Sequence, residues 1–319
     1  MTQNPKLVSV VIPIYNGEAD IPDLLECLRS QSYDTSHVEY LLVDNNSRDR
    51  TLELLTAAQT PDFPLKILTE TQIQSSYAAR NTGIRASQGE IIAFTDADCR
   101  PQTDWLKNLV QPFFKPEIGL TVGEIVGLEG SSLLERHATR HEVLSQKHTL
   151  NHTFCPYGQT ANLAVRRRIF EEVGLFRPYL TTGGDADICW RILRQNTWKY
   201  EFVAEAIVSH RHRATWDELR RQWQRYGRSN RYLHELYGIP LMREATWQEI
   251  GYRGLRWLLK EVPIQGVKML SGRASELDVM QTPIDLFTFR ARSQGQKQAK
   301  LPEAAREIVG LDSENSNKI

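Results

Sequence analysis

Apolar residues follow two alternating periods along the first third of the chain. Leu7–Ile12 is a continuous apolar run rich in β-branched residues and closed by Pro13, which predicts a buried strand. The next apolar residues, from Ile21 to Leu28, fall at i, i+3, i+4 and i+7 and predict one helix stripe. The same alternation predicts strands at Val38–Val43, Leu65–Leu68 and Ile91–Thr95 and helices at Asp49–Ala58 and Ser75–Ala86. This order predicts an α/β fold with a mostly parallel sheet covered by helices.

The pattern is less regular beyond residue 120. It predicts a strand at Leu120–Val126, helices at Ser131–Leu150, Arg167–Val173, Asp185–Gln195 and Thr215–Leu236, and a strand pair within Tyr200–Val208. Trp247–Leu270 is partly amphipathic and carries basic residues. We expect it to pack against the main domain, with a peripheral contact to a membrane surface as the alternative. The last thirty or so residues are polar and predict a mobile tail.

Composition narrows the class of protein. Of 319 residues, 40% are hydrophobic and 24% charged, which is typical of a globular protein. The 39 basic and 39 acidic residues give no net charge, which argues against nucleic acid as a partner. The four cysteines are far apart and form no CxxC pair, so we expect reduced thiols. Without a signal-peptide pattern or an apolar run of about 20 residues, we expect a cytoplasmic location.

Acidic residues follow two of the predicted strands. Asp44 ends the second strand, and Asp96 and Asp98 follow the fourth. Parallel sheets bind ligands beyond the carboxyl ends of their strands. Two carboxylates in this spacing can present oxygens to Mg²⁺ or Mn²⁺, or to a ribose beside the ion. The alternative is a plain turn, in which aspartate is common.

Five segments in order resemble family 2 glycosyltransferases, which are nucleotide-sugar enzymes of the GT-A fold. The segments are VSVVIPIYNGE, LLVDNNSRDRT, AARNTGIRASQGEIIAFTDADC, ANLAVRRRIFEEVGLF and GGDADICWRI. The resemblance covers roughly residues 7–235. It implies a metal-bound nucleotide-diphospho-sugar donor, inversion at the anomeric centre and one carboxylate acting as base.

The resemblance implies that the first loop contacts the nucleotide. Pro13, Tyr15 and Asn16 would form this contact, with Tyr15 stacked on the base; a tyrosine that only packs in a turn is the alternative. Asp44 would accept a hydrogen bond from a ring N–H such as that of uracil or guanine. Its alternative is an Asx turn into the next helix.

The resemblance also assigns the residues around the Asp-x-Asp motif. Asp98 would ligate Mn²⁺ or Mg²⁺, and Asp96 would bind the ribose or the same ion. Arg80, in the Ala-Arg-Asn segment, would pair with a phosphate or with Asp96 itself.

GGDADICWRI matches the family's acidic motif, except that Gly184 replaces a glutamate. Asp185 thereby becomes the candidate general base, which takes the proton from the acceptor hydroxyl. The alternative is a capping role at the helix start. Asp187 and Arg191, spaced i, i+4, are expected to form a structural pair.

Two further segments match family positions near the diphosphate. His210 is the candidate metal or diphosphate ligand, with His212 as the alternative. Gln222 and Arg225, on an arginine-rich helix, would reach the donor diphosphate or the acceptor. A solvated basic helix is the alternative reading of this segment.

Together these features predict an inverting, metal-dependent glycosyltransferase. Its donor would be a UDP- or GDP-sugar, and its acceptor a glycan or a lipid-linked molecule. Residues 1–235 would form the GT-A domain, with a nucleotide-binding half at 7–126 and an acceptor half at 127–235. Residues 236–290 would add a helical extension and residues 291–319 a disordered tail. A sugar-nucleotide nucleotidyltransferase and a non-catalytic binding protein are the alternatives.

Overall fold

The computed structural model describes residues 6–195, 197–244 and 246–312. The chain forms two compact units. Within the described residues, unit 1 comprises residues 6–126, 144–210 and 302–312, and unit 2 comprises residues 127–143 and 211–301. This division differs from the expected boundary at residue 235, because the chain returns to unit 1 at residues 144 and 302.

In the described part of the chain, unit 1 contains one eight-stranded sheet with the order β3-β2-β1-β4-β7-β6-β8-β5. The strands are β1 (Val8–Ile14), β2 (Val38–Asp44), β3 (Leu65–Thr69), β4 (Ile91–Phe94), β5 (Cys99–Pro101), β6 (Ile118–Gly127), β7 (Leu163–Arg166) and β8 (Lys199–His210). β1 to β4 pair in parallel, whereas β7 is antiparallel to β4 and β6, and β5 to β8. The predicted fold class is confirmed, and the second half of the sheet is antiparallel.

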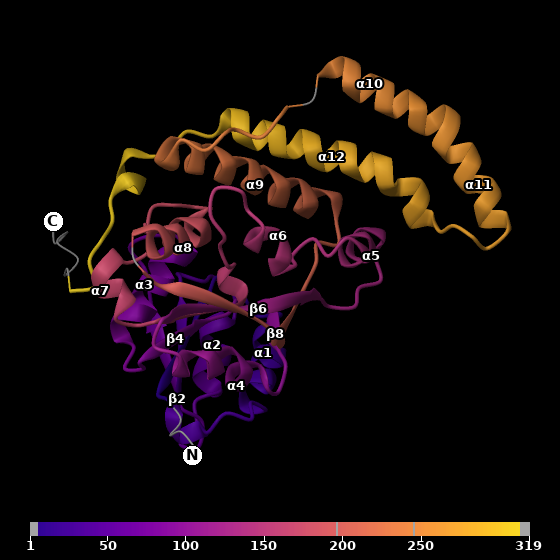
Figure 1. The fold of residues 1–319 in the computed structure, drawn as a ribbon. Coiled ribbons are helices and arrows are strands. Elements are labelled where there is room, and N and C mark those ends of the chain that lie inside the picture. The colour runs from indigo at the N-terminus through magenta and orange to yellow at the C-terminus, as the bar shows by residue number, and fades with distance from the viewer. Residues whose placement is uncertain (1–5, 196, 245, 313–319) are drawn as a thin grey trace. The chain divides into compact units, whose positions relative to one another are not determined.

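Helices cover both faces of this sheet (Figure 1). They are α1 (Ile21–Arg29), α2 (Thr51–Ala57), α3 (Ser76–Ala86), α4 (Trp105–Val110), α6 (Gln146–Leu150), α7 (Ile169–Val173) and α8 (Gly184–Gln195). Val10 and Ile12 of β1 share a core with Leu24 of α1, whereas Val11 faces Gly83 of α3. β4 and β2 lie on opposite sides of β1. The connection from β1 to β2 through α1 and the connection from β3 to β4 through α3 run across the sheet in opposite directions. Right-handed connections that run in opposite directions lie on opposite faces, so α3 and α1 cover opposite faces of the sheet.

β1 is longer than the sequence predicted. The strand continues through Pro13 to Ile14, and both residues are buried. A central strand forms ladder hydrogen bonds with a neighbour on each side, and proline lacks an N–H to donate to either ladder. Pro13 is tolerated here because the pairing of β1 with β4 ends at Val11.

Unit 2 is helical. Its helices are α5 (Leu133–Arg140), α9 (Trp216–Tyr237), α10 (Trp247–Arg256), α11 (Val262–Leu270) and α12 (Glu276–Gln298), and a π-helical turn at Trp257–Glu261 joins α10 to α11. α9 and α12 lie side by side (Figure 1). Gly227 of α9 faces the backbone of Arg292, and Gly295 of α12 faces the backbone of Gln224, which allows the close approach. Among the described residues, no helix has the length and apolarity needed to cross a membrane.

Two predictions for the middle of the chain are wrong in detail. The helix expected over residues 131–150 is two helices, because Glu142 adopts a φ of 46° and Ser145 caps a new start. α5 belongs to unit 2 and α6 to unit 1, so the break coincides with a crossing between units. The strand pair expected within Tyr200–Val208 is the single strand β8, whose sequence contains no glycine, proline, asparagine or aspartate to form a turn.

The mobile tail expected at residues 291–319 is also wrong where the structure describes it. α12 continues to Gln298. Beyond it, Val309 accepts a backbone hydrogen bond from Leu175 at 2.8 Å, and Ala305 is fully buried. The polar composition of this part of the chain predicted disorder. The segment after α12 is instead held by the backbone hydrogen bond to Val309 and by the burial of the small residue Ala305. Residues 313–319 lie outside the described residues.

Candidate active site

The carboxyl ends of β1, β2 and β4 lie at one edge of the sheet, because these strands are parallel. Strand order reverses between β1 and β4. Open α/β sheets bind ligands at such a reversal. Tyr15 follows β1, Asp44 ends β2 and Asp96 follows β4. The structure therefore brings these three predicted residues to the edge where a ligand is expected.

The loop after β1 exposes an aromatic ring. Tyr15 is 50% exposed. Asn16 adopts a φ of 49°, and its backbone N–H donates to Ser47 Oγ at 2.9 Å while its Oδ1 accepts from the Arg48 N–H at 2.9 Å. Asn16 thus ties this loop to the one after β2. Pro13 is buried inside β1, so Tyr15 is the ring of this segment that a base can reach.

Asp44 is buried at the end of β2, with an exposed fraction of 5%. Both of its carboxylate oxygens accept from the Ser47 N–H at 3.3 Å, which is the turn contact that the alternative reading predicts. Bonds of this length are weak. The carboxylate therefore keeps lone pairs for a second donor.

Arg80 of α3 fixes the position of Asp96. Its Nη2 donates to Asp96 Oδ1 at 2.5 Å, and its guanidinium lies 5.6 Å from the centre of the Tyr77 ring. The Arg80 side chain is 4% exposed and that of Asp96 is 30% exposed. Arg80 therefore pairs with Asp96, which is one of the two roles that the sequence analysis gave it. Asp96 remains partly exposed to solvent.

Asp98 meets His210 through the register of two strands that are distant in sequence. Cys99 of β5 lies opposite His210 of β8, so the residue before Cys99 is next to the imidazole. His210 Nε2 lies 3.3 Å from Asp98 Oδ1. His212, the alternative ligand, belongs to unit 2 and lines a pocket there.

Asp98, Cys99 and His210 form a group whose potential ligand atoms lie within 4.8 Å of one another. Burial, together with the carboxylates of Asp98 and Asp96, raises the pKa of the Cys99 thiol well above its ordinary value. A protonated thiol is a poor ligand. The carboxylate oxygen of Asp98 suits Mn²⁺ or Mg²⁺, and the neutral imidazole of His210 can ligate a divalent transition metal such as Mn²⁺. The donor set therefore fits a divalent cation of this kind.

Asp185 lies in the first turn of α8, where the helix dipole favours a carboxylate. Its Oδ1 accepts a hydrogen bond from Thr160 Oγ1 at 2.8 Å. Thr160 stands just before β7, and β7 begins beside the end of β4 because the two strands are antiparallel. The Thr160 contact therefore places Asp185 at the same edge of the sheet as Asp96.

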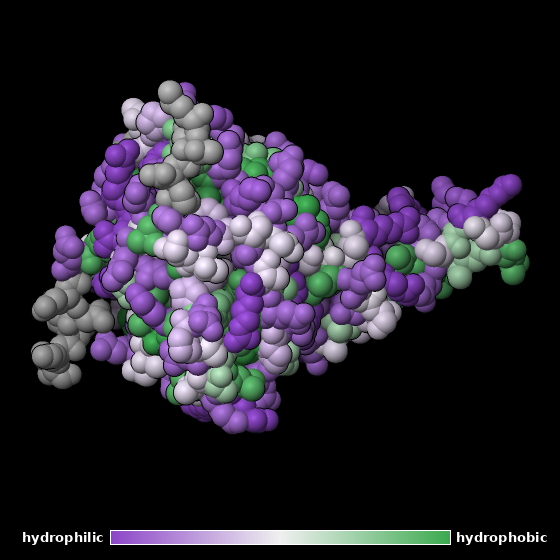
Figure 2. Space-filling model, turned by 90° about the horizontal axis from the view of Figure 1, so that it is seen from below, coloured by the Kyte–Doolittle hydropathy of each residue, from purple (hydrophilic) through white to green (hydrophobic). Residues whose placement is uncertain are grey.

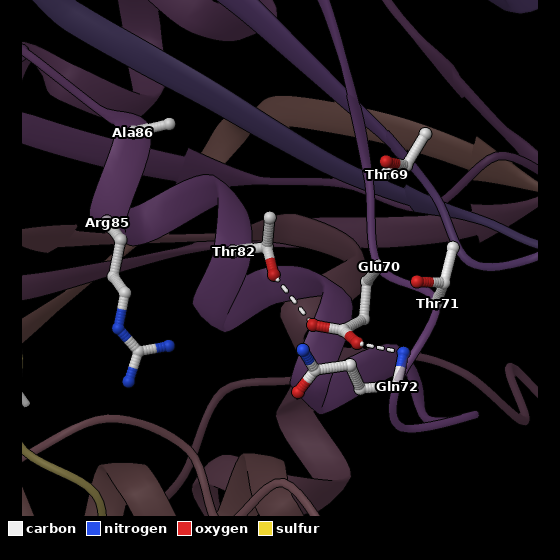
Figure 3. Close-up of a pocket in the computed structure, with 7 residues that line it drawn as sticks. All are labelled: Thr69, Glu70, Thr71, Gln72, Thr82, Arg85 and Ala86. Carbon is white, nitrogen blue, oxygen red and sulfur yellow. Dashed lines mark hydrogen bonds between the residues drawn. The ribbon is translucent and has the colours of Figure 1, made fainter. Parts of the chain in front are cut away.

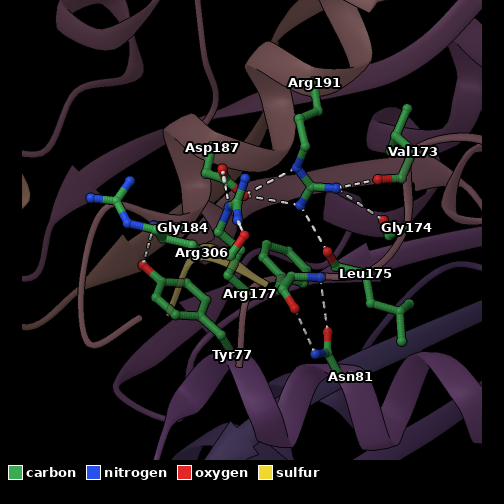
Figure 4. A network of polar contacts seen from close by, with 11 residues as sticks. Tyr77, Asn81, Val173, Gly174, Leu175, Arg177, Gly184, Asp187, Arg191 and Arg306 are labelled. Carbon is green, nitrogen blue, oxygen red and sulfur yellow. Dashed lines mark hydrogen bonds and ion pairs between the residues drawn. The ribbon is translucent and has the colours of Figure 1, made fainter. Parts of the chain in front are cut away.

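Asp187 has a different role from Asp185 (Figure 4). It is fully buried and accepts from Arg177 Nε and from Arg191 Nη2, each at 2.9 Å. The Gly184 N–H donates to the Tyr77 hydroxyl at 2.9 Å, which joins the start of α8 to α3. The pair expected between Asp187 and Arg191 is present. This network holds the helix that carries Asp185.

A hollow of about 460 Å³ lies at the end of β3 and beside α3 (Figure 3). Glu70 in this hollow accepts from the N–H groups of Gln72 and Ile73 and from Thr82 Oγ1. These bonds use both carboxylate oxygens. Glu70 thus holds the loop after β3. The last residue of β3, Thr69, pairs with Asp44 of β2.

Gln222 and Arg225 lie on α9 in unit 2. With Arg213, Glu218 and Arg221 they line a pocket of about 230 Å³. They belong to a different unit from Asp96 and Asp98, so a contact with the donor stays a prediction.

Three positioning residues escaped the sequence analysis, namely Thr160, Tyr77 and Arg177. Thr160 lies 25 residues from Asp185 in the chain, and Tyr77 lies 107 residues from Gly184. No local pattern connects such partners. The antiparallel pairing of β7 with β4 brings Thr160 to Asp185, and the position of α3 beside the start of α8 brings Tyr77 to Gly184.

Comparison with known proteins identifies the family of this arrangement. The family model described as glycosyl transferase family 2 matches residues 9–194, which run from β1 to the last turn of α8. The glycosyltransferase AglE of Haloferax volcanii is 34% identical over 262 residues, which are 79% of this chain and 83% of that protein.

Solved structures show the same fold. The mannosyltransferase PcManGT from Pyrobaculum calidifontis, solved in complex with GDP-Man and Mn²⁺, has a TM-score of 0.62 at 18% identity and covers 91% of this chain and 86% of its own. TarS 1–349 of S. aureus, in complex with UDP-GlcNAc, has a TM-score of 0.53 at 16% identity and covers 91% of each chain. These likenesses show the predicted GT-A fold.

Proposed function

The chain belongs to glycosyl transferase family 2, and from this premise we propose that it transfers a sugar from a nucleotide-diphospho-sugar to a hydroxyl group with inversion. Family membership makes it a glycosyltransferase and sets aside the nucleotidyltransferase alternative. The sugar would be of the hexose type. The acceptor would be a glycan or a lipid-linked molecule.

The donor nucleotide would bind at the strand reversal. Tyr15 would stack on the base, a contact worth about 1–3 kcal/mol. Asp44 would accept from a ring N–H, which uracil and guanine both offer. The solved structures of similar fold hold GDP-Man and UDP-GlcNAc, which supports a UDP- or GDP-sugar here.

Asp98 and His210 would hold the divalent cation, with Asp96 binding the ribose or the same ion. Lewis-acid stabilisation of the departing diphosphate is the chemistry that such a cation supplies when bound. Arg80 would orient Asp96 through its short charge-assisted bond. His210 is favoured over His212 because it is the histidine beside Asp98.

Asp185 would act as the general base. Its carboxylate would take the proton of the acceptor hydroxyl as that oxygen bonds to the anomeric carbon and the bond to the diphosphate breaks. Positioned base catalysis contributes about 10²–10⁴-fold. Thr160 would hold the carboxylate at the angle that this transfer needs.

The observation that carries the proposal is the contact between Asp98 and His210 at the strand edge that also holds Asp96. A turnover assay with a panel of UDP- and GDP-sugars tests it. We expect hydrolysis of at least one donor, loss of that activity on chelation with EDTA, and its return with Mn²⁺. Asp98→Asn should lose the Mn²⁺-restored activity.

Asp62→Asn is the matched control, because Asp62 is exposed and stands before β3, at the opposite edge of the sheet. It should retain full activity. Activity that survives chelation would overturn the metal role. A chain that binds a donor yet never turns it over would favour the non-catalytic alternative.

A further inference from the structure

α10, the π-helical turn and α11 form one continuous helical segment, which we call the 247–270 segment. Its apolar side chains are open to solvent. The exposed fractions are 67% for Tyr252, 57% for Leu255, 67% for Leu259, 69% for Val267 and 91% for Leu270. Apolar residues gathered in this way on one surface element mark an interaction site.

These apolar residues lie along one face of the segment. Leu255 and Leu259 are four residues apart, which is one helical turn. Pro263 cannot donate to the carbonyl group of Leu259, and the helix widens into the π turn just before it. A π turn places residues five apart above one another, so Ile264 follows Leu259 and Val267 follows Ile264. The π turn thereby keeps the apolar face continuous.

A different face of the segment attaches it to α12. Trp257 Nε1 donates to the carbonyl oxygen of Val279 at 2.8 Å. The Glu261 carboxylate accepts from Thr282 Oγ1 at 2.6 Å and pairs with Arg256 at 2.6 Å. The exposed leucines take no part in these contacts. Unit 2 therefore does not need the apolar face for its own packing.

The charge of the segment complements an anionic surface. Residues 247–270 contain four basic and two acidic residues. Both acids, Glu249 and Glu261, are already paired with arginines. Within the described residues, Lys260 and Lys268 have no ion-pair partner. Lys260 follows Leu259 and Lys268 follows Val267, so each lysine lies beside an exposed apolar residue and the two lysines flank the apolar face.

We propose that the 247–270 segment docks on an anionic lipid surface. The segment would lie in the plane of the interface, with its apolar face among the acyl chains and its lysines among the head groups. Figure 2 shows hydrophobic residues of this segment at the right end of the view, next to hydrophilic ones. A spanning mode does not fit, because no described helix is suited to cross a bilayer. The inference goes beyond the proposed function and does not depend on it.

Co-sedimentation of the full chain with vesicles tests this docking. One set of vesicles contains phosphatidylcholine alone, and the other contains phosphatidylcholine mixed with phosphatidylglycerol. We expect binding to the mixed vesicles that weakens as salt rises, and binding about tenfold or more weaker to phosphatidylcholine alone. The combined variant Leu255→Glu, Leu259→Glu and Val267→Glu should abolish binding. Lys260→Glu with Lys268→Glu should weaken it about tenfold or more.

Leu52→Glu is the matched control, because Leu52 is 46% exposed on α2 of unit 1. It should bind vesicles like the wild type. Circular dichroism confirms that each variant is folded. Equal vesicle binding by the wild type and the triple variant would overturn the proposal. A wild-type dimer that the triple variant converts to a monomer, with no vesicle binding, would overturn it in favour of a second copy on this face.

Discussion

Asp185 and Asp187 stand two residues apart in the first turn of α8, yet their surroundings differ. Asp187 is fully buried between two arginines, whereas Asp185 is partly exposed and bonded to Thr160. A buried carboxylate between two guanidinium groups stabilises the fold. A partly exposed carboxylate at a strand edge can meet a substrate hydroxyl, which is the role proposed for Asp185.

We expect Asp187→Asn to destabilise the chain. The substitution leaves Arg177 and Arg191 buried without their counter-charge, and breaking such a pair costs about 3–5 kcal/mol. Urea unfolding followed by circular dichroism measures the loss. Glu53→Gln is the control, because the Arg50–Glu53 pair is exposed and should change the free energy of unfolding by about 0.5 kcal/mol or less. Equal effects of the two substitutions would show that Asp187 is not a structural anchor.

His137 on α5 should make the stability of unit 2 depend on pH. Burial, and then the neighbouring His141, lower its pKa from the ordinary 6.5, although Asp285 and Gln281 oppose this. The folded state therefore holds fewer protons than the unfolded state as pH falls below 6.5, so stability falls with it. The loss continues until pH reaches the lower, folded-state pKa.

The variant His137→Phe should remove this contribution. We expect the wild type to lose more stability than the variant when the pH is lowered through 6.5. Denaturation midpoints on either side of that pH measure the difference. Parallel losses in the two proteins would mean that His137 titrates alike in the folded and unfolded states.

Which residues form the site could be predicted only in part. The positions of Tyr15, Asp44 and Asp96 follow from local strand endings, and these are visible as apolar runs. The contact of Asp98 with His210 depends on the pairing of β5 with β8, which lie far apart in the chain. The spacing of apolar residues along the chain does not indicate how two distant strands pair.

At the scale of elements, α9 and α12 pack through glycines. Gly227→Ala would place a methyl group against the carbonyl oxygen of Arg292, which is backbone and cannot turn away. We expect a loss of about 1–3 kcal/mol in the free energy of unfolding. Denaturant unfolding of the variant measures it.

Gly254→Ala on α10 is the matched control, because a methyl group added there meets open space. It should stabilise the chain by about 0.5–1 kcal/mol, since alanine favours the helix. Opposite signs for the two variants are the expected result. Stabilisation by both would contradict close packing of α9 on α12.

Element type was predicted best where one period persists. The long helix α9 and the strands β2 to β4 match the sequence prediction closely. The prediction failed where the chain crosses between units, at Glu142, and where polar residues form a packed helix, in α12. In both places the tertiary arrangement overrides the local pattern.

At the scale of the whole molecule, the chain returns to unit 1 after α12. Ala305 is fully buried in this last segment, and Arg177 donates to the carbonyl oxygen of Arg306. Arg177 also holds Asp187, so the segment supports the network beneath α8. Residues near the end of the chain therefore belong to the scaffold of the candidate site.

We expect Ala305→Asp to destabilise unit 1 by about 2 kcal/mol or more, because it buries an unpaired charge. Ala304→Asp, at an exposed neighbouring position, should change the free energy of unfolding by about 0.5 kcal/mol or less. Thermal unfolding of both variants measures the difference. Equal melting temperatures would contradict docking of this segment on unit 1.

The central claim is that one carboxylate holds the cation for the donor and another removes the acceptor proton. Isothermal titration of a donor in the presence of Mn²⁺, beside a transfer assay, separates these roles. Asp98→Asn should weaken donor binding at least about tenfold. Asp185→Asn should bind the donor like the wild type while transfer falls about 10²–10⁴-fold. Wild-type donor binding by Asp98→Asn, or wild-type transfer by Asp185→Asn, would contradict the account.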